Sequence, residues 1–185
     1  MYNSSVSLST KQLKLTSSSN QDKLIVHNLL QKKVLAIEHN DQLKLENQLC
    51  FSVYACSREI TKMYRPYLDK LGITYPQYLV LLVLWEQHET TVKALGAELY
   101  LDSGTLTPLL KRMEESGLVR RERSKEDERR VMVRLTIKGE ELRDDASIIP
   151  DAMATNSGLS KEEFTKALTG FQQLLDHIHS VNDKK

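Results

Sequence analysis

The sequence predicts a mainly helical protein with one small β-hairpin, an α+β fold built from 185 residues. Three observations support this class. An amphipathic helical pattern precedes Gly117, two short strand-like segments around a charged turn follow it, and further helical patterns lie on both sides. A helix followed directly by a basic hairpin is the outline of a winged helix-turn-helix. The segment from Asp102 to Leu135 is therefore the most informative part of the chain.

The helix before Gly117 follows from residue spacing. Its apolar residues occur at i, i+3, i+4 and i+7, and therefore share one face: Leu106, Leu109, Leu110 and Met113. Asp102 or Ser103 can cap its N-terminus, and Gly117 stands where a glycine commonly ends a helix. After Gly117, residues 118–123 (LVRRER) and 130–135 (RVMVRL) predict two strands, joined by the polar turn 124–129 (SKEDER).

Two helices are predicted upstream of this segment. Thr74 and Gln77 form a T-x-x-Q capping box that opens the first. Its inward-facing residues are expected to be Tyr78, Leu79, Leu82 and Trp85. Thr91 can cap a second, shorter helix. Helices that lead into a third in this way form a helix-turn-helix core, so residues 74–135 predict a complete winged helix-turn-helix.

The flanking segments, residues 44–72 and 136–180, have the character of dimerisation helices. The first carries one apolar stripe and a second beside it; the main stripe consists of Leu49, Val53, Cys56, Ile60 and Met63. Thr136 can begin a helix that we expect to end near Pro150. A capping box at Ser160 and Glu163 opens the last helix, whose apolar residues suit packing on another helix: Phe164, Ala167, Leu168, Phe171, Leu175 and Ile178. Apolar first and last helices predict a homodimer.

Composition narrows the function classes. Residues 103–135 contain nine Lys or Arg and six Asp or Glu, a net charge of +3 in a chain whose formal net charge is +1. The positive charge is therefore local, as on a nucleic-acid-binding surface. No apolar run approaches the ~18 residues of a membrane span, and no secretory signal is recognisable, so we expect a cytoplasmic protein without a membrane partner. Residues 1–43 are Ser-rich in part and are predicted to be a flexible extension.

These features favour double-stranded DNA as the partner. Hydroxyl groups near the start of the helix and basic residues one turn later suit a helix in a major groove. The candidate DNA-binding residues on the helix are Ser103, Thr105, Thr107, Pro108, Lys111 and Arg112, and those in the hairpin are Arg121, Arg123, Lys125, Asp127, Arg129 and Arg130. The alternative is an ordinary surface helix and hairpin with solvated charges. The hairpin and the polarised charge together favour DNA.

The segments LENQLCFSVYACSREITKMYRPYLDKLGITYPQY and YLDSGTLTPLLKRMEESGLVRRERSKEDERRV resemble the MarR family of winged helix-turn-helix regulators, and within it the OhrR branch of organic hydroperoxide sensors. The resemblance covers about residues 45–175. It implies a dimeric repressor that binds a pseudo-palindromic operator and releases it when organic hydroperoxides oxidise a cysteine near the start of the first helix. That position is Cys50. It further implies that Asp127 orients Arg129 into the minor groove, and that Tyr64 and Tyr75 of the partner subunit lie beside Cys50.

The chemistry of Cys50 can also be considered from its position. A thiolate attacks a peroxide oxygen and becomes a sulfenic acid, and the start of a helix favours an anion. Tyr54, at i+4, lies on the same face and its hydroxyl could donate to the sulfur. Tyr64 is ~21 Å away along a straight helix, so a contact with it requires the partner subunit or a helix break. The structural alternative is that Cys50 is simply a small buried residue.

Cys56 is expected to belong to the core, since it shares the stripe of Leu49, Val53 and Ile60. No cysteine occurs near the C-terminus, so the chain resembles the one-cysteine type, whose sulfenic acid needs a low-molecular-weight thiol to form a stable mixed disulfide.

Three other functions remain open at this point. A regulator of the same fold could respond to a phenolic or drug-like ligand in the dimer cleft, the chain could be a thiol peroxidase, or it could be an interaction protein that uses its C-terminal helix. The basic hairpin argues against an enzyme. No metal-ligand, phosphate-loop or cofactor motif is recognisable, so we expect no metal and no cofactor.

Overall fold

The computed structural model describes residues 41–124 and 126–183, and the chain divides into two compact units, residues 1–55 and 56–185. In the first unit the described part contains the short 3-10 helix η1 (Leu45–Asn47) and the beginning of α2 (Leu49–Leu71). The expected extension, residues 1–43, lies almost entirely outside the described residues.

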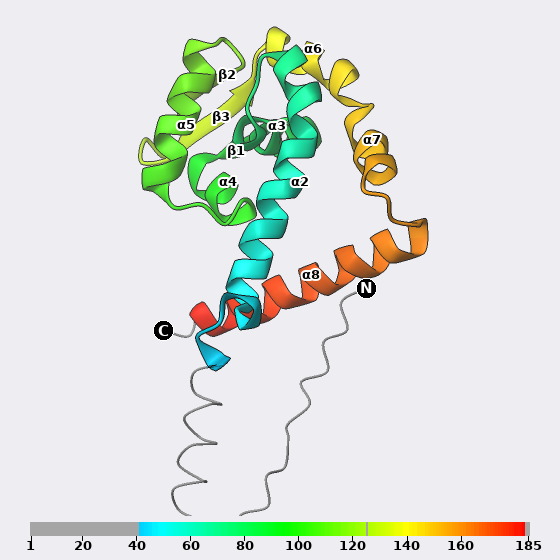
Figure 1. The fold of residues 1–185 in the computed structure, drawn as a ribbon. Coiled ribbons are helices and arrows are strands. Elements are labelled where there is room, and N and C mark those ends of the chain that lie inside the picture. The colour runs from blue at the N-terminus through cyan, green and yellow to red at the C-terminus, as the bar shows by residue number, and fades with distance from the viewer. Residues whose placement is uncertain (1–40, 125, 184–185) are drawn as a thin grey trace, which may run out of the picture. The chain divides into compact units, whose positions relative to one another are not determined.

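The second unit contains the predicted winged helix-turn-helix (Figure 1). Its helices α3 (Tyr75–Gln87), α4 (Val92–Glu98) and α5 (Ser103–Glu115) precede strands β2 (Val119–Arg123) and β3 (Val131–Leu135). A further strand, β1 (Glu89–Thr91), was not predicted. It pairs with β3, so the antiparallel sheet has the order β1-β3-β2. The expected class, mainly helical with a small hairpin, is confirmed.

The core of this unit lies where α3, α4 and α5 meet the sheet. Its fully buried side chains include Leu81, Leu95, Leu110 and Val133. The predicted apolar face of α5 is confirmed, because all four of its residues are buried: Leu106, Leu109, Leu110 and Met113. Burial of one stripe on α5 leaves its polar side outward.

The prediction for α3 was partly wrong. Tyr78 and Trp85 are buried as expected, but Leu82 is 41% exposed, while Leu81 and Leu84 are completely buried. This helix is apolar on nearly every side (YLVLLVLW), so its sequence pattern does not distinguish an inward face.

The caps form where the sequence predicts them. The Asp102 carboxylate accepts from the Thr105 backbone N–H at 2.9 Å and so caps α5. At the other end of α5, Gly117 has a φ of 71°, and its N–H donates to the Glu114 carbonyl while that of Leu118 donates to the Met113 carbonyl. This pattern is a Schellman motif, which requires the left-handed conformation that glycine adopts without strain.

The helix beginning after Thr136 ends earlier than expected. Helix α6 covers Ile137–Ala146, and a separate helix, α7, covers Ile149–Asn156. Pro150 therefore lies in the first turn of α7 rather than at the end of α6. A proline is tolerated there because the first N–H groups of a helix have no partner within the helix.

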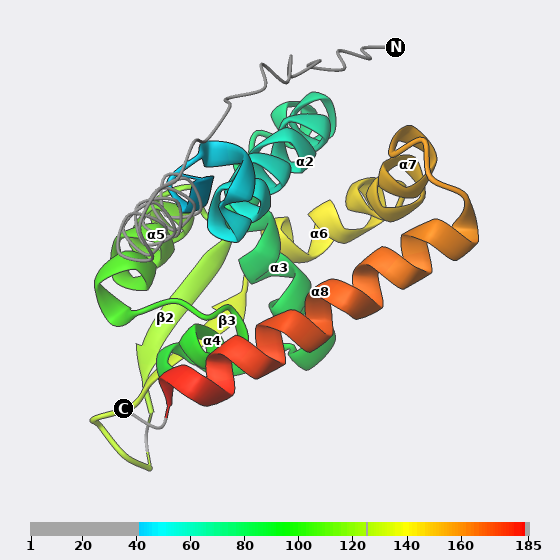
Figure 2. The ribbon, with the colours of Figure 1, turned by 60° about the horizontal axis from the view of Figure 1, so that its bottom comes forward.

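The last helix, α8 (Lys161–Asn182), is the long helix near the C-terminus in Figure 2. It begins at the predicted capping box and has no buried residue. Its apolar residues remain largely exposed, Leu168 at 50% and Phe171 at 48%. Cys56 is also exposed, so the prediction that it belongs to the core was wrong for the single chain. Among the described residues, no helix combines the length and apolar character needed to cross a membrane.

Candidate nucleic-acid interface and cysteine site

A hollow of about 1290 Å³ lies between α4, α5, the hairpin and the C-terminal turn of α8. Ser103 and Thr107 of α5 line it, and so do Arg129 and Arg130 of the hairpin. The fold thus brings together residues from both halves of the predicted DNA-binding set, although they are more than twenty positions apart in the sequence.

The N-terminus of α5 is held in place by Asp102. One carboxylate oxygen accepts from the Thr105 backbone and the other from the Thr105 hydroxyl, at 2.9 and 3.0 Å. These hydrogen bonds lower the pKa of Asp102. Because the Thr105 hydroxyl already donates to Asp102, it would approach a nucleic acid as an acceptor only. The remaining candidates on α5 are exposed: Ser103, Thr107, Pro108, Lys111 and Arg112.

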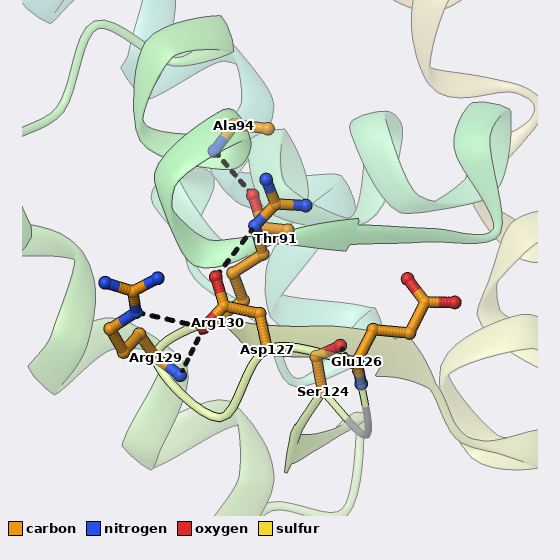
Figure 3. A network of polar contacts seen from close by, with 7 residues as sticks. All are labelled: Thr91, Ala94, Ser124, Glu126, Asp127, Arg129 and Arg130. Carbon is orange, nitrogen blue, oxygen red and sulfur yellow. Dashed lines mark hydrogen bonds and ion pairs between the residues drawn. The ribbon is translucent and has the colours of Figure 1, made fainter.

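Asp127 organises the tip of the hairpin, as Figure 3 shows. Its Oδ1 accepts from both the backbone N–H and the Nε of Arg129, each at 3.1 Å. Its Oδ2 lies 3.7 Å from the Arg130 Nε. The hydrogen bonds from Arg129 lower the pKa of Asp127, while the Arg129 side chain stays 92% exposed. Asp127 therefore holds the Arg129 guanidinium at its Nε, while the side chain remains accessible to solvent.

Arg121 is placed differently from the other basic residues. Its Nε and Nη2 donate to one oxygen of Glu114 at 3.0 and 2.6 Å, and its backbone N–H donates to the other oxygen at 2.9 Å. Its side chain is only 24% exposed. Arg121 also lines the hollow that Ser103 and Arg129 line, so its contact with DNA stays a prediction. Arg123 is exposed, and Lys125 lies outside the described residues.

Two residues at the start of α4, its N-cap Thr91 and Lys93, were missed by the sequence analysis as lining residues. Thr91 and Lys93 line the same hollow as Ser103 and Arg129. Thr91 was recognised only as a cap, and its Oγ1 indeed accepts from the Ala94 N–H at 3.0 Å. The signal that could have found Lys93 is a basic residue in the first turn of the helix that precedes the reading helix.

The residues predicted for the cysteine site are described in each unit separately. Cys50 is the second residue of α2 and is exposed, and Tyr54, one turn later, is 57% exposed. In the second unit the rings of Tyr64 and Tyr75 lie 4.9 Å apart, and that of Tyr78 lies 5.9 Å from Tyr64. Burial raises the pKa of all three phenols, and Tyr75 adds to the rise at Tyr64. These hydroxyls are therefore protonated donors at neutral pH.

Comparison with known proteins identifies the family. A family model described as the transcriptional regulator SarA/Rot matches residues 62–146. The organic hydroperoxide resistance transcriptional regulator of Bacillus subtilis is 54% identical over 142 residues, which cover 77% of this chain and 97% of that protein. The chain belongs to the MarR family of winged-helix transcriptional regulators.

Solved structures agree with this MarR-family assignment. Reduced AbfR bound to DNA has 41% identity and a TM-score of 0.61, over 76% of this chain and 98% of that one. The same regulator is also known in an overoxidized form bound to DNA and in a disulfide form. A cysteine-to-serine mutant of MarR from E. coli in complex with operator DNA has a TM-score of 0.63 at 24% identity, over 69% and 93% of the two chains, and supports the fold alone.

Proposed function

We propose that this protein is a homodimeric, DNA-binding transcriptional repressor that senses organic hydroperoxides through Cys50 and then releases its operator. One observation carries the proposal. The chain covers nearly the whole of a regulator of organic hydroperoxide resistance at 54% identity, and its Cys50 is exposed at the start of a helix. It acts as a regulator rather than an enzyme, since each oxidised cysteine changes DNA binding instead of completing a catalytic cycle.

The first step is oxidation of the cysteine. The Cys50 thiolate attacks the outer oxygen of a hydroperoxide ROOH; a sulfur–oxygen bond forms, the oxygen–oxygen bond breaks, and RO⁻ leaves and takes up a proton as ROH. Cys50 becomes a sulfenic acid. The position of Cys50 supports this step, because its exposed side chain in the first turn of α2 leaves the sulfur accessible to a hydroperoxide.

Phenol hydroxyls are proposed to hold the sulfur before oxidation. Tyr54 of the same helix supplies a hydroxyl group, and the Tyr64–Tyr75 pair of the partner subunit supplies protonated donors, which suit an anionic sulfur. Within one chain Cys50 and Tyr64 are fourteen residues apart on α2, or ~21 Å along a straight helix, so a shared pocket requires two protomers.

A low-molecular-weight thiol would complete the response. The chain has two cysteines, both in α2, and Cys50 and Cys56 are separated by ~9 Å of helix rise, beyond the reach of a disulfide. A small thiol R′SH can instead attack the Cys50 sulfenic acid, with loss of water, to give a mixed disulfide. The added group would occupy the space between the tyrosines and displace the helices that join the two subunits.

The DNA contacts are proposed on both grooves. The exposed side of α5, with Ser103, Thr107 and Lys111, suits the major groove, and Arg129 suits a narrow minor groove, whose negative potential attracts arginine. A two-fold dimer would place two such surfaces on successive turns of a pseudo-palindromic operator. The exposed apolar residues of α2 and α8 support the dimer, since no residue in the described part of the chain buries them.

Fluorescence anisotropy with the promoter upstream of the protein's own gene tests the proposal. Wild type, Cys50→Ser and the matched control Cys56→Ser are each treated with stoichiometric cumene hydroperoxide and a small thiol. We expect wild type and Cys56→Ser to release the DNA and Cys50→Ser to remain bound.

Other outcomes contradict parts of the proposal. If Cys50→Ser also releases the DNA, the sensor is another residue. If no variant responds, the alternative of a ligand-responsive regulator, with a phenolic compound in the dimer cleft, is favoured. Repeated consumption of peroxide with a thiol reductant, independent of DNA, would instead indicate a thiol peroxidase.

A further inference from the structure

Glu114 and Arg121 join the reading helix to the hairpin. Glu114 lies in the last turn of α5 and Arg121 in the middle of β2. The Glu114 carboxylate accepts three hydrogen bonds from Arg121, two from the guanidinium and one from the backbone N–H, at 2.6 to 3.0 Å. The guanidinium hydrogen bonds make the largest contribution to lowering the pKa of Glu114, so the pair is ionised at neutral pH.

The pair bridges the short loop that connects α5 to β2. Residues 116–118 connect α5 to β2, and Gly117 at their centre adopts a φ of 71°. A turn of this length can act as a pivot for the hairpin. Glu114 and Arg121 are seven positions apart, and their hydrogen bonds join the two sides of that turn. They therefore restrain the direction in which β2 leaves the helix.

Arg121 lines the same hollow as the arginines at the tip but differs from them in exposure and pairing. Its side chain is 24% exposed, whereas that of Arg129 is 92% exposed. A guanidinium that donates two hydrogen bonds to a carboxylate is poorly placed to serve a phosphate as well. Arg121 opposes Val133, a fully buried residue of the central strand β3, so its backbone is anchored in the sheet.

We propose that Glu114 and Arg121 are positioning residues for operator recognition: they set the angle between reading helix α5 and the hairpin, so that Arg129 reaches the minor groove when α5 lies in the major groove. Neither side chain contacts a base or a phosphate. The inference rests on the proposed DNA-binding function and adds residues that determine specificity through the position of others.

The substitution Glu114→Gln distinguishes this positioning role from a simple electrostatic role, because the two predict opposite changes in operator affinity. If Arg121 were a phosphate contact restrained by Glu114, removal of the carboxylate charge would raise DNA affinity. If the pair positions the hairpin, operator affinity falls even though the protein surface becomes less negative. Affinity for unrelated DNA, which depends mainly on charge, stays equal or rises.

Arg121→Lys gives an independent test. It keeps the positive charge but loses the planar guanidinium that makes two hydrogen bonds to one carboxylate. If Arg121 contacts a phosphate, Arg121→Lys should keep operator affinity with a similar salt dependence. If Arg121 positions the hairpin, operator affinity should fall. Two neighbours supply matched controls: Glu115→Gln removes a charge whose partner Lys111 is 3.9 Å away, and Arg120→Lys changes an arginine that pairs with Glu122 on the exposed side of β2.

The operator is first selected from random-sequence duplex DNA with the reduced wild-type dimer. Affinity is then measured for the selected sequence and for unrelated DNA of equal length, over a range of salt concentrations. We expect Glu114→Gln and Arg121→Lys each to lower the ratio of specific to unrelated affinity about tenfold or more, within the range of one mismatched base pair. The salt slope of both variants should be unchanged, and both controls should keep the wild-type ratio of specific to unrelated affinity.

A double mutant shows whether the effect passes through the hairpin. Combined with Arg129→Ala, Glu114→Gln should cost little further affinity, because the minor-groove contact is already absent. Full additivity would overturn the proposal, and so would higher operator affinity of Glu114→Gln or a flatter salt slope of Arg121→Lys. If no sequence is selected, the proposed DNA-binding function fails and this inference fails with it; if wild type selects an operator and the variants read it equally well, only the inference fails.

Discussion

The junction between α6 and the end of α5 allows a sharp prediction for Gly139→Ala. A Cβ at Gly139 would lie 2.2 Å from the Leu118 carbonyl oxygen and 3.1 Å from the Leu135 side chain. The first contact is with backbone, which no rotamer change relieves, so the start of α6 must retreat by about 1 Å. That movement weakens the hydrogen bonds from Thr136 to the Gly117 carbonyl, at 2.6 Å, and from Trp85 to the Gly139 carbonyl, at 2.9 Å.

The loss of stability in Gly139→Ala can be worked out from the overpacking and the weakened hydrogen bonds. Overpacking of this kind costs about 1–3 kcal/mol, and each weakened hydrogen bond costs about 1 kcal/mol. Alanine is a better helix former than glycine and offsets about 1 kcal/mol of this cost, so the free energy of unfolding should fall by about 3 kcal/mol. For a chain of this size the melting temperature should then fall by about 6–12 °C.

Thermal and urea unfolding at one fixed protomer concentration measure this effect, since the proposed dimerisation would contribute to stability. Gly170→Ala is the matched control, because Gly170 lies on α8 and a Cβ there meets nothing within 4 Å. It should leave the stability unchanged or raise it by up to about 1 kcal/mol. A Gly139→Ala variant as stable as Gly170→Ala would refute the close packing of α6 on the α5–β2 turn.

Four further predictions concern DNA binding and assembly. Arg129→Ala should weaken operator binding most where the flanking minor groove is A·T-rich, and equal losses on A·T-rich and G·C-rich flanks in anisotropy titrations would contradict a minor-groove role. Lys111→Ala should lower affinity on all sequences and flatten the salt slope by about one unit; a sequence-dependent loss would indicate a base contact instead. Phe171→Glu should give a monomer in analytical ultracentrifugation, unless the exposed face of α8 is not the dimer interface. Because Arg129 lowers the pKa of Asp127, the contribution of this pair is complete above the usual carboxyl pKa of about 4 and is lost only as pH falls through the lowered value. Operator affinity should therefore show no carboxylate titration as pH falls to about 4, and a step centred near that usual value would be evidence against the pair.

The sequence predicted those features that depend on neighbouring residues. The cap at Asp102, the stop at Gly117 and the box at Ser160 and Glu163 each involve residues three or four positions apart, so the sequence contains the whole interaction. The buried face of α5 was predictable for the same reason, since its period repeats within one helix. The pair of Asp127 and Arg129 is equally local.

Features that depend on distant partners were not predictable. Strand β1 has three residues, too few for an alternating pattern, and exists because β3 pairs with it about forty positions later. Arg121 was predicted as a DNA contact from its charge, whereas its bond to Glu114 on another element could not be predicted from the sequence. Cys56 looked like a core residue because an apolar stripe does not reveal whether the same chain or a second subunit covers it.

The hydrogen bonds around Gly117 make the reading head a single block. Lys138 and Thr136, at the start of α6, donate to the Ser116 and Gly117 carbonyls at the end of α5, at 2.9 and 2.6 Å. Trp85 of α3 donates to α6 at Gly139. A displacement of α6 that left α5 behind would break these bonds at a cost of about 1 kcal/mol each, so α6 and the reading helix are expected to move together.

In a dimer bound at two successive major grooves, about 34 Å apart, a change in the spacing between two intact heads is then enough to lose affinity. On this argument oxidation at Cys50 need not unfold or distort either head. Hydrogen exchange of the α5 backbone should be the same in the reduced and oxidised dimers when both are free of DNA, and faster exchange on oxidation would show that the head itself is disrupted.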